Sequence, residues 1–154
     1  MLNMEAESAK HLEIRTLTIE DYHAITKLWK RAGLPFKPGG RDSKRGMGKQ
    51  MRAFPEFFIG AFHENTLVGV VIGSYDGRMK GWINRLAVDP TYRHRGIAQQ
   101  LIGHAEEALE KRGATIFAAL VETPNKESLR LFQKMGYVAH REILYISKRE
   151  SQAA

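Results

Sequence analysis

One stretch of the sequence decides the fold, and it reads Leu86-Ala87-Val88-Asp89-Pro90-Thr91-Tyr92-Arg93-His94-Arg95-Gly96-Ile97-Ala98. It starts as an apolar strand, passes through a short basic turn and enters a helix at Gly96. The first turn of a helix has free backbone N–H groups and the positive end of the helix dipole, so it attracts phosphate groups. Gly96 and Ala98 leave room for an anion at the backbone, while Arg93 and Arg95 add charged donors. The stretch therefore predicts a turn that binds a pyrophosphate.

Hydrophobic patterns on both sides of this stretch predict the remaining elements. Strands are expected over residues 11–17, 57–62, 67–72, 82–88, 115–121 and 142–147. Helices are expected over 18–32, 45–53, 96–112 and 125–135, with Thr18 and Asp21 as a capping pair and Gly33, Gly113 and Gly136 as helix stops. The order is therefore β-α-α-β-β-β-α-β-α-β, which indicates an α/β domain (α+β) with a mixed sheet.

Length and composition favour one soluble domain. The chain has 154 residues, 43% of them hydrophobic and 27% charged, which is typical of a globular protein. We expect a domain over 11–149 between tails at 1–10 and 150–154. The sequence holds no cysteine, no apolar run of the roughly 20 residues that span a bilayer, and no secretory signal at its start. It also shows no metal-ligand spacing among its histidines. These features predict a cytoplasmic protein that uses no metal.

Positive charge is concentrated in one segment, residues 27–52, which we call the basic segment. The whole chain carries a formal net charge of +7, and the basic segment alone has nine basic residues against one acid, Asp42. Charge of this density favours an anionic partner, whether an acidic substrate, a nucleic acid or a ribosome. A solvated face kept soluble by like charges is the alternative interpretation.

Two motifs give the sequence a family resemblance. The residues Arg93-His94-Arg95-Gly96-Ile97-Ala98 resemble the acyl-CoA-binding motif of the GCN5-related N-acetyltransferases (GNAT), written Arg/Gln-X-X-Gly-X-Gly/Ala. A second motif of this family is matched by Asn125, Ser128-Leu129-Arg130-Leu131-Phe132 and Met135-Gly136-Tyr137. The resemblance covers about residues 11–149. Within the family the chain is similar to small members of the kind that acetylate the N-termini of ribosomal proteins.

The resemblance implies a fold and a set of cofactor contacts. The GNAT fold has a mixed, mostly antiparallel central sheet flanked by helices. Its cosubstrate is acetyl-CoA, whose pantetheine arm would pair with the backbone of Leu86, Ala87 and Val88 as an extra strand. Backbone N–H groups of Arg93, His94, Arg95, Gly96, Ile97 and Ala98 would hold the pyrophosphate. Asn125 would contact the cofactor at the start of its helix, where it is also suited to cap that helix.

The catalytic groups are less well matched. The family often has a tyrosine seven residues after the asparagine, and it protonates the departing thiolate. Here that position is Phe132, which has no proton to give but is expected to pack against the pantetheine. Glu122, at the end of the strand expected over 115–121, is our candidate for the general base. Its alternative is a solvated loop carboxylate.

These inferences predict an acetyl-CoA-dependent N-acetyltransferase, in which a primary amine attacks the thioester directly in a ternary complex. The sequence does not identify the acceptor. We consider an acidic molecule, a protein N-terminus and a ribosomal protein as candidates. A non-catalytic acyl-CoA-binding regulatory module is the alternative, because Phe132 replaces the tyrosine. A nucleic-acid binder ranks last, because the excess of positive charge is modest and the sequence lacks the interleaved aromatic residues of base-stacking surfaces. No membrane partner is expected, and the sequence does not distinguish a monomer from a homodimer.

Overall fold

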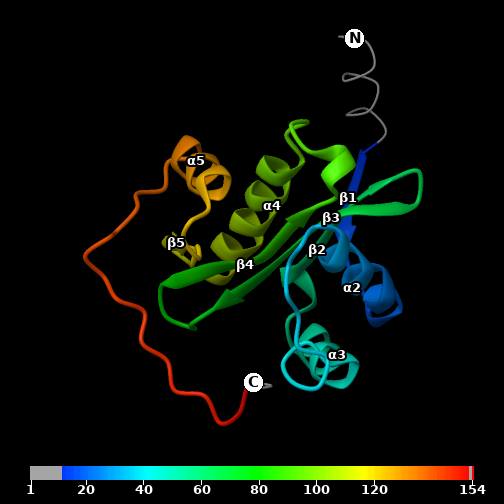
Figure 1. The fold of residues 1–154 in the computed structure, drawn as a ribbon, viewed down its shortest axis with the longest axis horizontal. Coiled ribbons are helices and arrows are strands. Elements are labelled where there is room, and N and C mark those ends of the chain that lie inside the picture. Colours follow the sequence, from blue (N-terminus) through cyan, green and yellow to red (C-terminus); the bar gives the residue numbers. More distant parts are fainter. Residues whose placement is uncertain (1–11, 153) are drawn as a thin grey trace.

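The computed structural model describes residues 12–152 and 154, and it is built around one five-stranded sheet (Figure 1). The strands are β1 (Leu12–Thr16), β2 (Phe58–His63), β3 (Thr66–Tyr75), β4 (Lys80–Val88) and β5 (Ile116–Ala118). They lie in sequence order, with antiparallel pairing from β1 to β4 and parallel pairing between β4 and β5. The expected fold class, a mixed and mostly antiparallel sheet, is confirmed. The expected N-terminal tail and His11 lie outside the described residues.

Among the described residues, four α-helices flank the sheet: α2 (Tyr22–Arg31), α3 (Lys44–Ala53), α4 (Ile97–Arg112) and α5 (Lys126–Lys134). Their ends carry the expected capping contacts. The Asp21 carboxylate accepts the Thr18 N–H at 2.8 Å, and Gly113 ends α4 with a positive φ of 117°. In the part of the chain that the structure describes, no helix has both the length and the apolar character needed to cross a bilayer.

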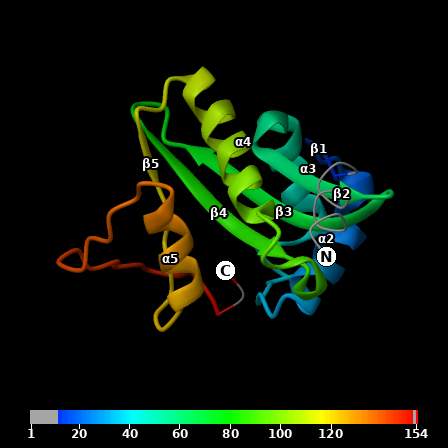
Figure 2. The same ribbon diagram turned by 90° about the horizontal axis from the view of Figure 1, so that it is seen from above.

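The sheet separates α4 from α2 and α3 (Figure 1 and Figure 2), and a cluster of buried apolar side chains lies on each of its faces. On one face α2 and α3 pack through a cluster that includes Ile25, Leu28 and Trp29, all fully buried. On the other face α4 packs through Leu101 and Leu109, which are also fully buried. Both faces of β3 are therefore covered, which explains its nearly continuous apolar sequence.

Two expected strands differ from the structure. The strand expected over 115–121 is reduced to the three residues of β5, because only these pair with β4. The strand expected over 142–147 is wrong: these residues form no strand, and the chain after α5 runs past β5 without pairing (Figure 1). Ile143, Leu144, Tyr145 and Ile146 are 66–86% exposed. Apolar β-forming residues predict a strand only where a neighbouring strand receives them, and this segment has none.

The close approach of α4 to the sheet can be tested at two glycines. A Cβ at Gly69 of β3 would lie 2.8 Å from Leu101 Cδ1 and 3.1 Å from Ile97 Cγ2, so Gly69→Ala forces α4 outward. We expect it to lower the free energy of unfolding by about 1–3 kcal/mol. Gly103→Ala in α4 itself meets no atom within 4 Å and should raise that free energy by up to about 1 kcal/mol. Urea unfolding of both variants measures the difference, and equal effects would contradict the packing.

Candidate active site

The site is created by a kink in β4. The pairing of β4 with β3 shifts register between Ile72↔Asn84 and Val70↔Ala87, and Arg85 in this bulge has a positive φ of 54°. On its other side β4 pairs with β5 only as far as Trp82. Beyond this point the two parallel strands part. The last three residues of β4 therefore have β3 on one side and no paired strand on the other.

The turn that follows β4 is shaped for an anion. Asp89 begins it by accepting hydrogen bonds from the N–H of Thr91 at 3.0 Å and from its hydroxyl at 2.8 Å. His94 and Gly96 both have positive φ values, 63° and 78°, and α4 starts directly afterwards. Left-handed residues in a short turn can direct neighbouring backbone N–H groups to one side of the chain, and such groups bind anions. The 16 residues of α4 add the positive end of their dipole at the same place.

A cleft of about 850 Å³ joins these features. Its walls come from three parts of the chain: the end of α2, the end of β4 with the turn and first residues of α4, and one side of α5. The lining residues are Ala32, Gly33, Leu34, Leu86, Ala87, Val88, Tyr92, Arg93, His94, Gly96, Ile97, Ala98, Gln99, Asn125, Glu127, Ser128, Arg130, Leu131 and Lys134. The cleft therefore brings together the backbone at the end of β4, the turn before α4 and two cations of α5, Arg130 and Lys134.

Nine of the eleven residues that the sequence nominated for cofactor binding line this cleft. They are Leu86, Ala87, Val88, Arg93, His94, Gly96, Ile97, Ala98 and Asn125. Asn125 also caps α5, since its side-chain oxygen accepts the Ser128 N–H at 3.1 Å. The two positions named for this residue, helix cap and cleft wall, are therefore compatible.

Three nominated residues lie outside the lining. Arg95 is placed beside Tyr92, with its guanidinium carbon 5.0 Å from the ring centroid. Phe132 is 8% exposed and packs in the apolar layer under α4, 5.0 Å from the ring of Tyr137. Glu122 is exposed in the segment between β5 and α5, three residues before Asn125. The structure thus brings together most of the residues nominated for cofactor binding. It leaves the candidate base, Glu122, outside the lining of the cleft.

Tyr137 does not replace the missing tyrosine at position 132. Its hydroxyl donates a hydrogen bond of 2.7 Å to Glu106 on α4. Burial raises the pKa of Tyr137, and the hydrogen bond with Glu106 raises it further. The phenol thus stays protonated, but its proton is directed at α4 and not into the cleft.

Sequence reasoning missed two walls of the cleft. One is the end of α2, formed by Ala32, Gly33 and Leu34. These residues look like an ordinary helix stop, and nothing local indicates that they face β4. The other is α5, whose Arg130 and Lys134 are spaced one helical turn apart. That i, i+4 pair of cations was a usable signal for an anionic ligand.

The end of α2 is tied to the turn after β4. Arg31 Nε donates to the Asp89 carboxylate at 3.1 Å, and Arg93 reaches the carbonyl of Ala32 at 3.5 Å. Burial alone would raise the pKa of Asp89, but the hydrogen bonds from Thr91 and Arg31 outweigh it and hold the pKa below its usual value. Asp89 is therefore an anionic anchor between two walls of the cleft.

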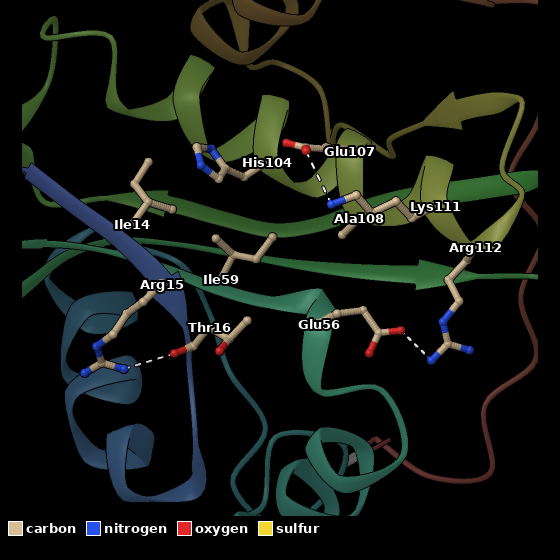
Figure 3. A pocket seen from close by; sticks show the side chains of 10 residues that line it. All are labelled: Ile14, Arg15, Thr16, Glu56, Ile59, His104, Glu107, Ala108, Lys111 and Arg112. Atoms are coloured by element: carbon tan, nitrogen blue, oxygen red, sulfur yellow. Dashed lines mark hydrogen bonds and ion pairs between the residues drawn. The ribbon is translucent and has the colours of Figure 1, made fainter.

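A second cavity, of about 400 Å³, lies between α4 and β1 (Figure 3). Ile14, Ile59 and Ala108 supply apolar surface. Its charged groups pair with one another, as Glu107 does with Lys111 at 3.4 Å and Glu56 with Arg112. These pairs leave the acids and bases of its rim already engaged. The cleft beside the phosphate-binding turn is therefore the candidate active site.

The anchoring role of Asp89 predicts a stability effect that depends on pH. Because its pKa is lowered in the folded state, the carboxylate stabilises the protein above the ordinary pKa of 3.8, and this contribution is lost as the pH falls through the folded pKa. Asp89→Asn should cost about 1 kcal/mol at pH 7, and the difference from the wild type should shrink as the pH falls below 3.8 and vanish only below the folded pKa.

Urea unfolding between pH 7 and pH 2 measures this effect. Glu107→Gln is the control, since its exposed ion pair with Lys111 should contribute little at any pH. A loss for Asp89→Asn that stays constant over this range would contradict the assignment.

Comparison with known proteins finds relatives over most of the chain. The model of the acetyltransferase (GNAT) family matches residues 12–137. Acetyltransferase SG1711 of Sodalis glossinidius (strain morsitans) is 30% identical over 138 residues, which are 90% of this chain and 95% of that protein. Acetyltransferase plu1384 of Photorhabdus laumondii subsp. laumondii is 32% identical over 139 residues, with the same coverage of both chains.

Solved structures share the fold. Ard1 from Thermoplasma volcanium superimposes with a TM-score of 0.73 at 21% identity and covers 83% of each chain. The PaiA N-acetyltransferase of Thermoplasma acidophilum, solved in complex with coenzyme A, gives a TM-score of 0.69 at 23% identity and covers 80% of this chain and 87% of its own. With the family match over residues 12–137, the parted strands and the glycine-opened helix, the chain belongs to the acetyltransferase (GNAT) family.

Proposed function

We propose that this protein transfers the acetyl group of acetyl-CoA to a primary amine, with both substrates bound at once. One observation carries the proposal: a single cleft combines the unpaired end of β4 with an anion-binding turn at the start of α4. Acetyl-CoA has matching parts, a pyrophosphate at one end and an arm with two amides that leads to the thioester. We place the reaction in the cytoplasm, in keeping with the composition of the chain.

Each wall of the cleft has a role in this proposal. The backbone from Arg93 to Ala98 holds the pyrophosphate, and Arg130 and Lys134 add positive charge from α5. The backbone of Leu86 to Val88 pairs with the amides of the arm, as a strand would. Asn125 binds the arm at the start of α5. Specific side chains are needed at few of these points, since main-chain groups make most of the contacts.

The chemical step needs positioning more than covalent help. The amine nitrogen attacks the thioester carbon, the C–S bond breaks, and the thiolate leaves. A thiol with a pKa of about 8.5 leaves as a thiolate at pH 7 at a cost of about 2 kcal/mol, so the phenylalanine at position 132 is tolerable. Backbone N–H groups of β4 polarise the carbonyl, and Glu122 is the proposed base that receives the proton of the amine.

The direct test is release of the CoA thiol from acetyl-CoA in the presence of different acceptors. The panel contains peptides with free N-termini, lysine peptides, polyamines and amino acids. Turnover with any class supports the transferase and identifies its acceptor class. Binding of acetyl-CoA without turnover on the whole panel would favour the non-catalytic acyl-CoA-binding module instead.

A charge placed in the phosphate-binding turn tests the cofactor site without harming the fold. Ala98→Glu puts a carboxylate in the first turn of α4, where the helix dipole favours acids, so the free protein should keep or slightly gain stability. The same carboxylate repels a pyrophosphate, and we expect the Kd for acetyl-CoA to rise at least about 100-fold. Isothermal titration calorimetry measures it. Ala98→Gln is the neutral control of the same size, and an equal loss in both variants would point to bulk and contradict a phosphate site.

The finer part of the proposal is an acidic acceptor, or an acceptor carried by an acidic macromolecule. Eight of the nine basic side chains of the basic segment are exposed. Its single acid, Asp42, is only 5% exposed and is engaged inside the protein by the N–H of Lys37 at 2.7 Å. The outer surface of this segment is therefore positive throughout. The ribosomal-protein-S18-alanine N-acetyltransferase of Escherichia coli, which shares the fold with a TM-score of 0.65 at 21% identity, is named for a protein acceptor.

The start of α3 supports a functional reason for this charge. Lys44 and Arg45 occupy its first turn, where no acid is present. Cations at the positive end of a helix dipole destabilise a helix by about 0.3–1 kcal/mol each. Residues that weaken their own helix in this way are better explained by a partner than by solubility alone.

Neutralising part of the basic segment tests this acceptor class. The triple variant Arg41→Gln, Lys44→Gln and Arg45→Gln should raise the KM for an acidic acceptor peptide about tenfold at low salt, and much less at 0.5 M salt, because screening removes the attraction. The Kd for acetyl-CoA should not change. The matched control neutralises Arg78, Arg141 and Lys148, which are exposed elsewhere. If both triples behave alike, the acceptor is not selected by the basic segment.

A further inference from the structure

One side chain connects two of the three walls of the cleft, namely the end of β4 and the segment that follows α2. Arg85 stands in the bulge of β4, and its side chain is 17% exposed. Its Nη1 donates to the carbonyl of Pro35 at 2.7 Å, and its Nη2 donates to the Asp42 carboxylate at 3.3 Å. Its guanidinium carbon lies 4.2 Å from the ring centroid of Trp29. Arg85 thus joins β4 to α2 and to the loop over residues 33–43, which we call the acceptor-side loop.

Asp42 extends this contact through the acceptor-side loop. Its carboxylate accepts the N–H of Lys37 at 2.7 Å, and its carbonyl accepts the hydroxyl of Tyr22 at 2.7 Å. The loop begins at Gly33 and Leu34, which line the cleft, and ends at Ser43, which caps α3. Through Asp42, the guanidinium of Arg85 therefore fixes the loop of the basic segment that leads from the cleft to α3.

The conformation and burial of Arg85 reduce the stability of the folded protein, which favours a functional role for this residue. Arg85 is not glycine, yet its φ is 54°. Burial lowers the pKa of its guanidinium, with Asp42 opposing the shift, and its Nε has no hydrogen-bond partner among the residues that the structure describes. Strained backbone and desolvated charge together are typical of functional positions. Arg85 also directly precedes Leu86, the first of the three residues of β4 that face the cleft.

We propose that Arg85 is a positioning residue, which fixes the acceptor-side loop relative to the end of β4 so that the amine meets the thioester. The proposal rests on the acetyl transfer proposed above. It follows that the acceptor site and the cofactor strand are coupled through one guanidinium. A lysine at this position keeps the charge near Asp42 but cannot hold both the Pro35 carbonyl and the carboxylate in the same fork.

The first experiment needs no acceptor. Hydrogen–deuterium exchange of Arg85→Lys and Arg85→Gln should show at least tenfold faster exchange at the Lys37 and Asp42 amides, while the amides of β2 and β3 stay unchanged. Arg15→Gln is the matched control, because Arg15 also pairs with an aspartate, Asp21 at 3.2 Å, and lies 3.9 Å from a ring centroid, that of Phe62, but on β1. Unchanged exchange in the acceptor-side loop of Arg85→Lys would overturn the proposal. If Arg85→Gln fails to fold, Arg85→Lys and Asp42→Asn decide the outcome.

The second experiment measures kinetics with an acidic peptide that has a free N-terminus, or with the best amine of the panel. Arg85→Lys should raise the KM for the acceptor at least tenfold and leave the Kd for acetyl-CoA within threefold, because the end of β4 remains paired with β3. A parallel loss of acetyl-CoA binding would overturn the proposal, since Arg85 would then support β4 alone. Absence of turnover in the wild type would instead refute the proposed function and leave the exchange result to decide the role of Arg85.

Discussion

The parting of β4 from β5 after Trp82 is the constraint on which the rest of the structure depends. Parallel strands normally continue side by side, because each backbone group left unpaired in the interior is costly. Here a bulge and a left-handed residue turn β4 away, and the fold leaves main-chain groups open along one edge. The cleft, the short β5 and the exposed position of the following residues all derive from this one departure from regular pairing.

In the proposed function, charge is distributed so that acetyl-CoA and the acceptor meet different kinds of surface. On the cofactor side, backbone N–H groups and the dipole of α4 supply a directed field, and a few cations support it. On the other side, the basic segment presents charge on exposed side chains. Two buried or nearly buried carboxylates, Asp42 and Asp89, hold these surfaces in place and contribute little to the outer field. Anchoring and attraction are thus assigned to different residues.

Local sequence signals predicted most of the fold and most of the cleft lining that the end of β4 and the start of α4 supply. The caps at Thr18 and Asn125, the stop at Gly113 and the periodicity of α4 depend on neighbouring residues only, and these predictions are confirmed. The strand expected over 142–147 failed because pairing is a property of two segments, and the composition of one does not reveal the other.

The remaining parts of the site are non-local in the same sense. The wall at Ala32 to Leu34 becomes part of the cleft only because Arg31 and Arg93 bring it to the turn after β4. Arg85 meets an aspartate 43 residues away, and nothing near it in the sequence indicates that contact. The phenylalanine at 132, by contrast, was evident from the motif, and its burial shows what the side chain does in place of donating a proton.

The open backbone of Leu86 to Val88 has a consequence for how the protein varies. A surface made of main-chain N–H and C=O groups is present whatever side chains the strand carries, so those side chains are free to serve the core on one face and the acceptor side on the other. Substitutions there change packing or selectivity before they change the cofactor contact. A binding site of this kind depends on the path of the chain more than on its side chains, so the proposed cofactor contact tolerates a wide range of sequences on this strand.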